Sequence, residues 1–197
     1  MNTFWKSTFM GIVTFSLTGL AAVGSSTASA SYETAPYRVV RNEGKFELRD
    51  YPALVVVETP MGGANNSFMR LFRFIGGNNA ARQKIAMTTP VLMAGQATNA
   101  TMAFVMPQNT SASQVPKPTD PGVVVRVIAG GQFAVFRFSG GRNVSNETNA
   151  LAKLESWLDR EKLKQESGPM FGYFDPPWTL WFLRRNEVML RVASAAP

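Results

Sequence analysis

The side chains of this chain that could do acid–base or nucleophilic chemistry are carboxylates, tyrosines, lysines and serines, because its 197 residues include no histidine and no cysteine. A Ser-His-Asp triad, a Cys-His pair and a histidine metal site or general base are therefore excluded. Three acids are embedded in strand-like patterns: Glu47, Glu58 and Glu187. Their spacing gives no paired-carboxylate geometry for acid–base catalysis. We predict that the protein is not an enzyme, and a hydrolase built on one of these acids is the catalytic alternative.

The first thirty residues are typical of a targeting segment. They combine one cation, Lys6, an apolar stretch over residues 9–23 and an A-x-A sequence at residues 28–30. These features predict a cleaved secretory signal peptide at 1–30, and polar residues within the apolar stretch make a permanent anchor the weaker interpretation. We expect an exported protein, periplasmic or secreted, in which residues 31–197 form a single domain.

The expected mature chain is basic. Removing Lys6 leaves 20 − 1 = 19 Lys and Arg against 13 Asp and Glu, a net charge of +6. Such a surface is either simply solvated or attracts anionic ligands or an anionic membrane face. No zinc-finger or helix-turn-helix pattern is present, so nucleic acid is not expected as a partner. We expect a monomer without a stable membrane anchor, and its stability must come from packing because disulfides cannot form.

The chain consists of two similar halves, and each predicts the order strand, helix, strand, strand. In each half a strand candidate leads to paired glycines, at 62–63 and 140–141, followed by Asn and Ser residues that are typical of helix N-caps. The first helix should pack on the sheet through residues spaced i, i+3, i+4 and i+7, namely Phe68, Leu71, Phe72 and Ile75. The second should extend from about Asn143 to Gly168-Pro169.

The strand candidates after the helices are KIAMTTPVLM (84–93) and TMAFVMP (101–107) in the first half, and MFGYFD (170–175), TLWFLRR (179–185) and EVMLRV (187–192) in the second. A further candidate, VVVRVI (123–128), follows a proline-rich loop at 114–122. We expect Arg184, Arg185 and Glu187 to form an ion-pair network that ties the last strands together. Neither half could close a core alone. The pattern predicts an α+β domain in which an antiparallel sheet curls into a barrel and two helices lie on its outside.

Three separated motifs resemble the SOUL haem-binding protein family. KIAMTTPV is similar to the family signature K-I-x-M-T-x-P-V. FIGGNN follows the first helix, and FGYFDPPWTLWFLRRNEVML is similar to the closing segment of the family. The resemblance covers roughly Tyr32 to Val192. It implies a distorted antiparallel β-barrel of about eight strands, built from two βαββ-like halves and similar to the effector-binding domains of the Rob and gyrase-inhibitor type. The implied function is reversible, non-covalent binding of haem or another tetrapyrrole without catalysis.

The resemblance also implies a site, an apolar groove with a cation near the haem propionates. The residues of this chain that it places there are Phe68, Met69, Phe72, Arg73 and Met87. Some relatives are thought to use a histidine as axial ligand, and this chain has none. Iron ligation would then come from Tyr, Met or Lys, and the candidates are Tyr37, Tyr51, Tyr173 and Met69.

The alternative to haem is a different ligand for the same barrel. Without histidine, haem binding would be weak or absent, and the ligand would be another small lipophilic or anionic molecule of the cell envelope. The two alternatives predict different spectra, because haem changes its Soret absorbance on binding.

Overall fold

The structure is a computed structural model, and it describes residues 32–62 and 64–193. The predicted signal peptide lies outside the described residues. Within these residues, neither helix combines the length and the apolar character needed to cross a bilayer.

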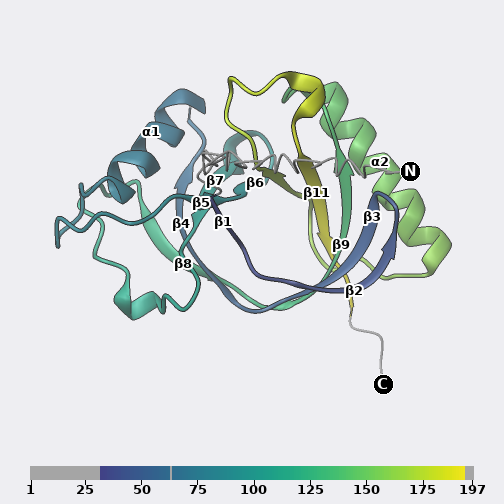
Figure 1. Ribbon diagram of the computed structural model, residues 1–197, viewed down its shortest axis with the longest axis horizontal. Coiled ribbons are helices and arrows are strands. Elements are labelled where there is room, and N and C mark those ends of the chain that lie inside the picture. The colour runs from purple at the N-terminus through teal and green to yellow at the C-terminus, as the bar shows by residue number, and fades with distance from the viewer. Residues whose placement is uncertain (1–31, 63, 194–197) are drawn as a thin grey trace, which may run out of the picture. The chain divides into compact units, whose positions relative to one another are not determined.

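Nine antiparallel strands form one curled sheet (Figure 1). In the order in which they pair, they are β2 (Arg38–Glu43), β3 (Phe46–Tyr51), β9 (Gly131–Phe138), β11 (Asn186–Arg191), β10 (Met170–Tyr173), β6 (Val91–Ala94), β7 (Thr101–Val105), β4 (Leu54–Pro60) and β8 (Val124–Ile128). A separate parallel pair joins β1 (Glu33–Thr34) to β5 (Thr88–Thr89). The helices are α1 (Ala64–Ile75) and α2 (Val144–Glu161), and they lie at opposite ends of the sheet. The predicted fold class is therefore confirmed, as a curled half-barrel with one more strand than the eight expected.

The predicted twofold repeat is visible in the order of the strands. Strands β4, β6 and β7 with α1 correspond to β9, β10 and β11 with α2, and the two halves meet where β6 pairs with β10. The strand that precedes each half in the sequence pairs with the other half. β3 pairs with β9 of the second half, and β8 pairs with β4 of the first half. This exchange is the structural reason why neither half can form a complete sheet alone.

Alternation along the strands separates the core into two faces. On β4, Val56 belongs to an inner cluster and Val57 to an outer cluster that packs under α1. On β9, Val135 belongs to the same inner cluster and Phe136 to an outer cluster under α2. Both helices therefore cover the outer face, and the inner face curls around a core of its own.

The helices confirm some of the predicted boundaries and correct others. Asn143 is the N-cap of α2, and its side chain accepts a hydrogen bond of 2.8 Å from the backbone N–H of Asn146. The helix ends at Glu161 instead of Gly168, because Lys162 adopts a left-handed conformation and its N–H bonds to the carbonyls of the last turn. In the first half, α1 begins at Ala64, before the residues expected to cap it.

The face of α1 that packs on the sheet is also corrected. Leu71 and Ile75 are buried as predicted, but their buried partner is Phe74, whereas Phe68 and Phe72 are exposed. The reason is that six of the eight residues from Phe68 to Ile75 are apolar, so more than one strip of the helix fits the predicted spacing.

Two of the predicted strands differ from the structure by more than their ends. In KIAMTTPVLM, only Thr88–Thr89 and Val91–Ala94 pair with neighbours, on either side of the cis Thr89–Pro90 bond. TLWFLRR forms a loop with a 3-10 turn at Trp181–Leu183. The N–H groups of Thr179 and Leu183 donate to carbonyls three residues earlier, at Pro176 and Leu180, so they are not available for a ladder.

Candidate ligand-binding groove

A groove of about 550 Å³ lies on the outer face, between α1 and the chain that follows β10. Its floor is formed by residues of β5 and β6 and by Met87, which precedes β5. The lining is almost entirely apolar and aromatic. It comprises Tyr32, Phe68, Met69, Phe72, Met87, Thr89, Val91, Tyr173, Phe174, Asp175, Pro176, Pro177 and Trp178. Clefts of this size and character typically hold small organic ligands.

One wall of the groove is the strip of α1 that does not pack on the sheet. Phe68, Met69 and Phe72 keep 37%, 43% and 48% of their surface exposed. The rings of Phe68 and Phe72 are nearly parallel, with centroids 6.0 Å apart. Phe68 also packs edge-on against the buried Phe104, at 5.3 Å. The wall is therefore fixed from below by the core and presents two aromatic rings to the groove.

The opposite wall is the 174–178 loop, which follows β10. The N–H of Arg185 donates to the carboxylate of Asp175 over 2.6 Å, and the guanidinium of Arg185 stacks on Phe174 at 4.0 Å. At the start of this wall, the hydroxyl of Tyr173 donates to Glu147 of α2. Burial and this carboxylate together raise the pKa of Tyr173 above its ordinary value.

The structure brings together five of the residues expected from the sequence. Phe68, Met69, Phe72, Met87 and Tyr173 all line the groove.

Three expected residues lie elsewhere. Arg73 is exposed and does not line the groove, although it follows Phe72 directly on α1. Tyr37 and Tyr51 pack against each other in the inner core, with ring centroids 5.2 Å apart, so they cannot reach a ligand held on the outer face.

Sequence reasoning missed Tyr32, Asp175 and Trp178. The double proline at 176–177 was the signal that could have found the last two, because prolines cannot donate to a ladder and force the chain off the sheet.

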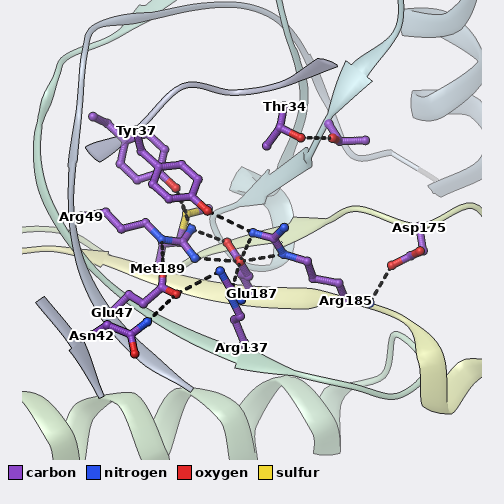
Figure 2. Close-up of polar contacts among 12 residues, drawn as sticks. Thr34, Tyr37, Asn42, Glu47, Arg49, Arg137, Asp175, Arg185, Glu187 and Met189 are labelled. Carbon is purple, nitrogen blue, oxygen red and sulfur yellow. Dashed lines mark hydrogen bonds and ion pairs between the residues drawn. The ribbon is translucent and has the colours of Figure 1, made fainter. Parts of the chain in front are cut away.

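The inner face carries a network of buried charges that the sequence predicted only in part (Figure 2). The guanidinium of Arg49 is fully buried and bonds to both carboxylate oxygens of Glu187 at 2.7 and 2.9 Å, and to Glu47 at 2.6 Å. Arg185 bonds to Glu187 at 2.7 Å, as predicted, and Arg137 bonds to Glu47 at 3.0 Å. Arg184, expected in the same network, donates instead to carbonyls of its own loop at Thr179 and Pro177.

The network holds the carboxylate of Glu187 in the charged form. Burial alone would raise the pKa of Glu187, but the hydrogen bonds and charges of Arg49 and Arg185 outweigh it and lower that pKa. The pocket nearby, lined by Tyr37 and Tyr51, has a volume of only about 20 Å³, enough for about one water molecule. Glu58, the third acid considered above, forms an ion pair with Arg126 at 2.9 Å. The network is a structural element beside a nearly filled core.

The sequence model of the SOUL heme-binding protein family matches residues 32–191. The chain belongs to the SOUL family. This confirms the resemblance carried by the three motifs. No curated protein matches the chain.

Several solved structures share the fold of this SOUL-family chain at low sequence identity. The C-terminal domain of EcmrR has a TM-score of 0.55 and 13% identity, covering 81% of this chain and 99% of its own. A hydrolase from Listeria innocua has a TM-score of 0.54 and 12% identity, with coverage of 78% and 94%. An uncharacterized conserved protein from Listeria innocua has a TM-score of 0.55 and 14% identity, covering 76% and 92%. At these identities the likeness concerns the fold alone.

The groove of this SOUL protein fits the group that its family binds in shape and in apolar character. A tetrapyrrole is a flat apolar disc, and the stacked rings of α1 face an aromatic and proline-rich wall. Four of the described lining residues carry atoms that can act as axial ligands of a haem iron. They are the sulfur atoms of Met69 and Met87 and the hydroxyl oxygens of Tyr32 and Tyr173. Across residues 32–62 and 64–193, no cluster of three or more acidic side chains is placed to bind a metal ion directly.

We expect the stability of this protein to decrease in alkaline solution through its buried tyrosines. Burial raises the pKa of Tyr51 from 10.0 to about 12, against the lowering effect of Arg49. Because the folded pKa is the higher one, this stabilisation is present below pH 10 and is lost as the pH rises through the folded value. Urea unfolding at several pH values between 10 and 12 should show that the free energy of unfolding decreases as the pH rises. In Tyr51→Phe this decrease should be smaller. The same substitution at the half-exposed Tyr32 is the control, and an equal slope in Tyr51→Phe and wild type would contradict the assignment.

Proposed function

We propose that this SOUL-family protein is exported and holds a haem or a related tetrapyrrole non-covalently in the groove between α1 and the 174–178 loop, without catalysing a reaction. The observation that carries the proposal is the groove itself. Its 550 Å³ are bounded by aromatic side chains on two opposite walls, Phe68 and Phe72 on one and Phe174 and Trp178 on the other. Export is supported by the features of residues 1–30 in the sequence.

The donors in the groove support a weakly ligated iron. The thioethers of Met69 and Met87 are neutral ligands, and they would hold the iron less firmly than a histidine or a thiolate. Tyr173 is a poor source of a phenolate, since its hydroxyl already donates to Glu147 and its pKa is raised. A bound haem would supply a redox-active iron, and the part of the protein is to enclose the macrocycle reversibly. Arg73 is positioned on the helix turn beside Phe72, and its cation is proposed to meet a propionate at the rim.

The absence of catalysis is supported by the state of the acids on the inner face. Glu47 and Glu187 are saturated by arginines, and the adjacent cavity of about 20 Å³ is too small for a substrate. A carboxylate in such a setting is not available as a general base or a nucleophile.

A second candidate ligand is a lipophilic cation, and one observation favours it. Asp175 is the charged residue among the described residues that line the groove. A carboxylate within an aromatic enclosure suits a cation better than it suits the two propionates of haem. The ligand test therefore includes a compound of this class.

The test is a titration of the protein with hemin, followed by the Soret absorbance, in wild type and in two matched variants. Phe72→Ala removes a ring that lines the groove, and Phe182→Ala removes a similarly exposed ring outside it. We expect saturable one-to-one binding that is roughly tenfold weaker in Phe72→Ala, since one apolar contact of this size is lost, and unchanged in Phe182→Ala.

Two results would contradict the proposal. One would favour the lipophilic cation as ligand, and the other would indicate no specific binding of hemin. The first is a wild-type spectrum identical to that of hemin alone, together with saturable binding of tetraphenylphosphonium in calorimetry that weakens in Asp175→Asn. The second is hemin binding that is equally affected by both phenylalanine substitutions, which would indicate non-specific adsorption.

A further inference from the structure

An exposed apolar loop follows the groove along the chain. Of the six residues 178–183, five are large and apolar, and each keeps 52 to 81% of its surface exposed: Trp178, Leu180, Trp181, Phe182 and Leu183. The loop lies at the top of Figure 1, between the two helices. Single exposed apolar residues are ordinary, but a continuous group of this size marks a surface that contacts something other than water.

The loop is held in this conformation by its own hydrogen bonds. Its two internal turns are closed by N–H groups of Thr179 and Leu183, as described above. Arg184 donates to the carbonyls of Thr179 and Pro177. The carbonyl of Trp181 accepts from the N–H of Gly140 over 3.0 Å, which ties the loop to the turn before α2. The apolar side chains are therefore displayed on a fixed backbone, and much of that backbone has its polar groups satisfied.

We propose that this loop docks the protein on an anionic lipid bilayer, with the side chains of residues 178–183 inserted at the interface. Tryptophans with leucine and phenylalanine beside arginines are the composition that prefers the boundary between headgroups and acyl chains. Satisfied backbone groups lower the cost of leaving water at that depth. The described residues carry 19 Lys and Arg against 13 Asp and Glu, a charge of +6 that is complementary to anionic headgroups. Arg184 directly follows the loop and places one of these positive charges next to the inserted residues.

Docking in this way would place the mouth of the groove at the membrane surface. Trp178 belongs to both features, since it lines the groove and begins the exposed loop. A poorly water-soluble ligand could then pass between bilayer and groove without crossing bulk water. The docking itself does not require that ligand, so it can be tested separately from the proposed function.

The test is flotation of the full-length protein with vesicles of phosphatidylcholine containing phosphatidylglycerol, compared with vesicles of phosphatidylcholine alone. We expect the protein to float with the anionic vesicles. The double variant Trp181→Ser/Leu183→Ser should reduce the partition coefficient roughly tenfold or more, because two large apolar contacts are lost. The matched control is Val124→Ser/Val127→Ser, which removes two exposed apolar side chains from the edge strand β8 and should leave flotation unchanged.

Fluorescence locates the contact. In a Trp5→Phe background, brominated phosphatidylcholine included in the anionic vesicles should quench the emission of Trp178 and Trp181, and the buried Trp157 should be spared. Phe72→Ala should leave flotation unchanged while it weakens hemin binding, and Phe182→Ala should do the reverse, so that the two proposals succeed or fail independently.

Three outcomes overturn the proposal. Flotation unaffected by Trp181→Ser/Leu183→Ser would show that another part of the chain binds the bilayer. Equal flotation with and without phosphatidylglycerol would exclude recognition of an anionic surface. A dimer in analytical ultracentrifugation that disappears in Trp181→Ser/Leu183→Ser, with no flotation of wild type, would assign the loop to contact between two copies of this chain.

Discussion

Replacing Arg49 by methionine should lower the free energy of unfolding by roughly 3–5 kcal/mol, because it removes one partner from a buried ion pair. The guanidinium of Arg49 is fully buried and forms four of the network's hydrogen bonds, to Glu47, Tyr51 and both oxygens of Glu187. Methionine fills much of the same volume. The decrease in the free energy of unfolding therefore reflects mainly the buried carboxylates that have lost their cationic partner. Urea unfolding followed by circular dichroism measures it.

The control is Arg38→Met, which breaks an ion pair of similar length on the surface. Arg38 and Asp50 lie 2.8 Å apart, but their side chains are 71% and 41% exposed. We expect a loss below about 1 kcal/mol, since solvent screens exposed pairs. If the two substitutions cost the same, the network on the inner face would not be the buried structural element that its geometry indicates.

The network also determines how stability responds to acid. The pKa of Glu187 is lower in the folded protein than its ordinary value of 4.5. The stabilisation is therefore fully present above that ordinary value and is lost as the pH falls through the folded pKa. In Arg49→Met this loss between neutral and acidic pH should be smaller, because the main cause of the lowered pKa has been removed.

Trp157→Ala should lower the free energy of unfolding by roughly 3–5 kcal/mol, as expected when a buried aromatic side chain is truncated and a cavity remains. Trp157 is 1% exposed in the core under α2 and stacks on Phe46 with centroids 5.5 Å apart. Its Nε1–H donates to Glu43 over 3.1 Å, and the guanidinium of Arg41 lies over its ring. Denaturant titration followed by circular dichroism measures the loss without relying on tryptophan emission.

The matched control is the same substitution at Trp181, which is 64% exposed. We expect Trp181→Ala to change stability by no more than about 0.5 kcal/mol, as surface substitutions usually do. A large decrease in the free energy of unfolding of Trp181→Ala would mean that the exposed loop stabilises the fold. Its apolar side chains would then have a structural role instead of a role in contacting a partner.

The repeated architecture could be predicted from the sequence because its signals are local. Paired glycines, the Asn143 cap and the apolar spacing of the helices each act within a few residues of the chain. The exchange of β3 and β8 between halves could not be predicted, since it joins strands far apart in sequence and depends on the order of the whole sheet.

The buried network illustrates a different limit. In FELR, residues 46–49, the polar residues alternate with apolar ones, and this pattern normally places the polar side chains in water. Arg49 is buried because the sheet curls and because Glu187, 138 residues later, supplies its partner. No pattern within β3 contains that information.

The groove was predictable on one wall and not on the other. Family resemblance located Phe72 and Met87, although the spacing of α1 assigned Phe72 to the core. The second wall was not predicted, because residues 170–175 are expected from their apolar pattern to form one strand, whereas β10 ends at Tyr173 and residues 174–178 leave the sheet. Trp178 and its neighbours are exposed, and sequence hydrophobicity alone cannot distinguish an exposed apolar loop from a buried strand.

The position of β10 and β11 has a consequence for how the protein is made. These strands are the last two of the sheet in chain order, and they occupy its middle, where β10 pairs with β6 and β11 with β9. A nascent chain that has not yet released residues 170–191 contains two partial sheets with no strand to join them. The complete sheet must then wait until these two strands have been synthesised. A chain that remains unfolded until its last strands arrive is also one that can still be threaded through a narrow translocation channel.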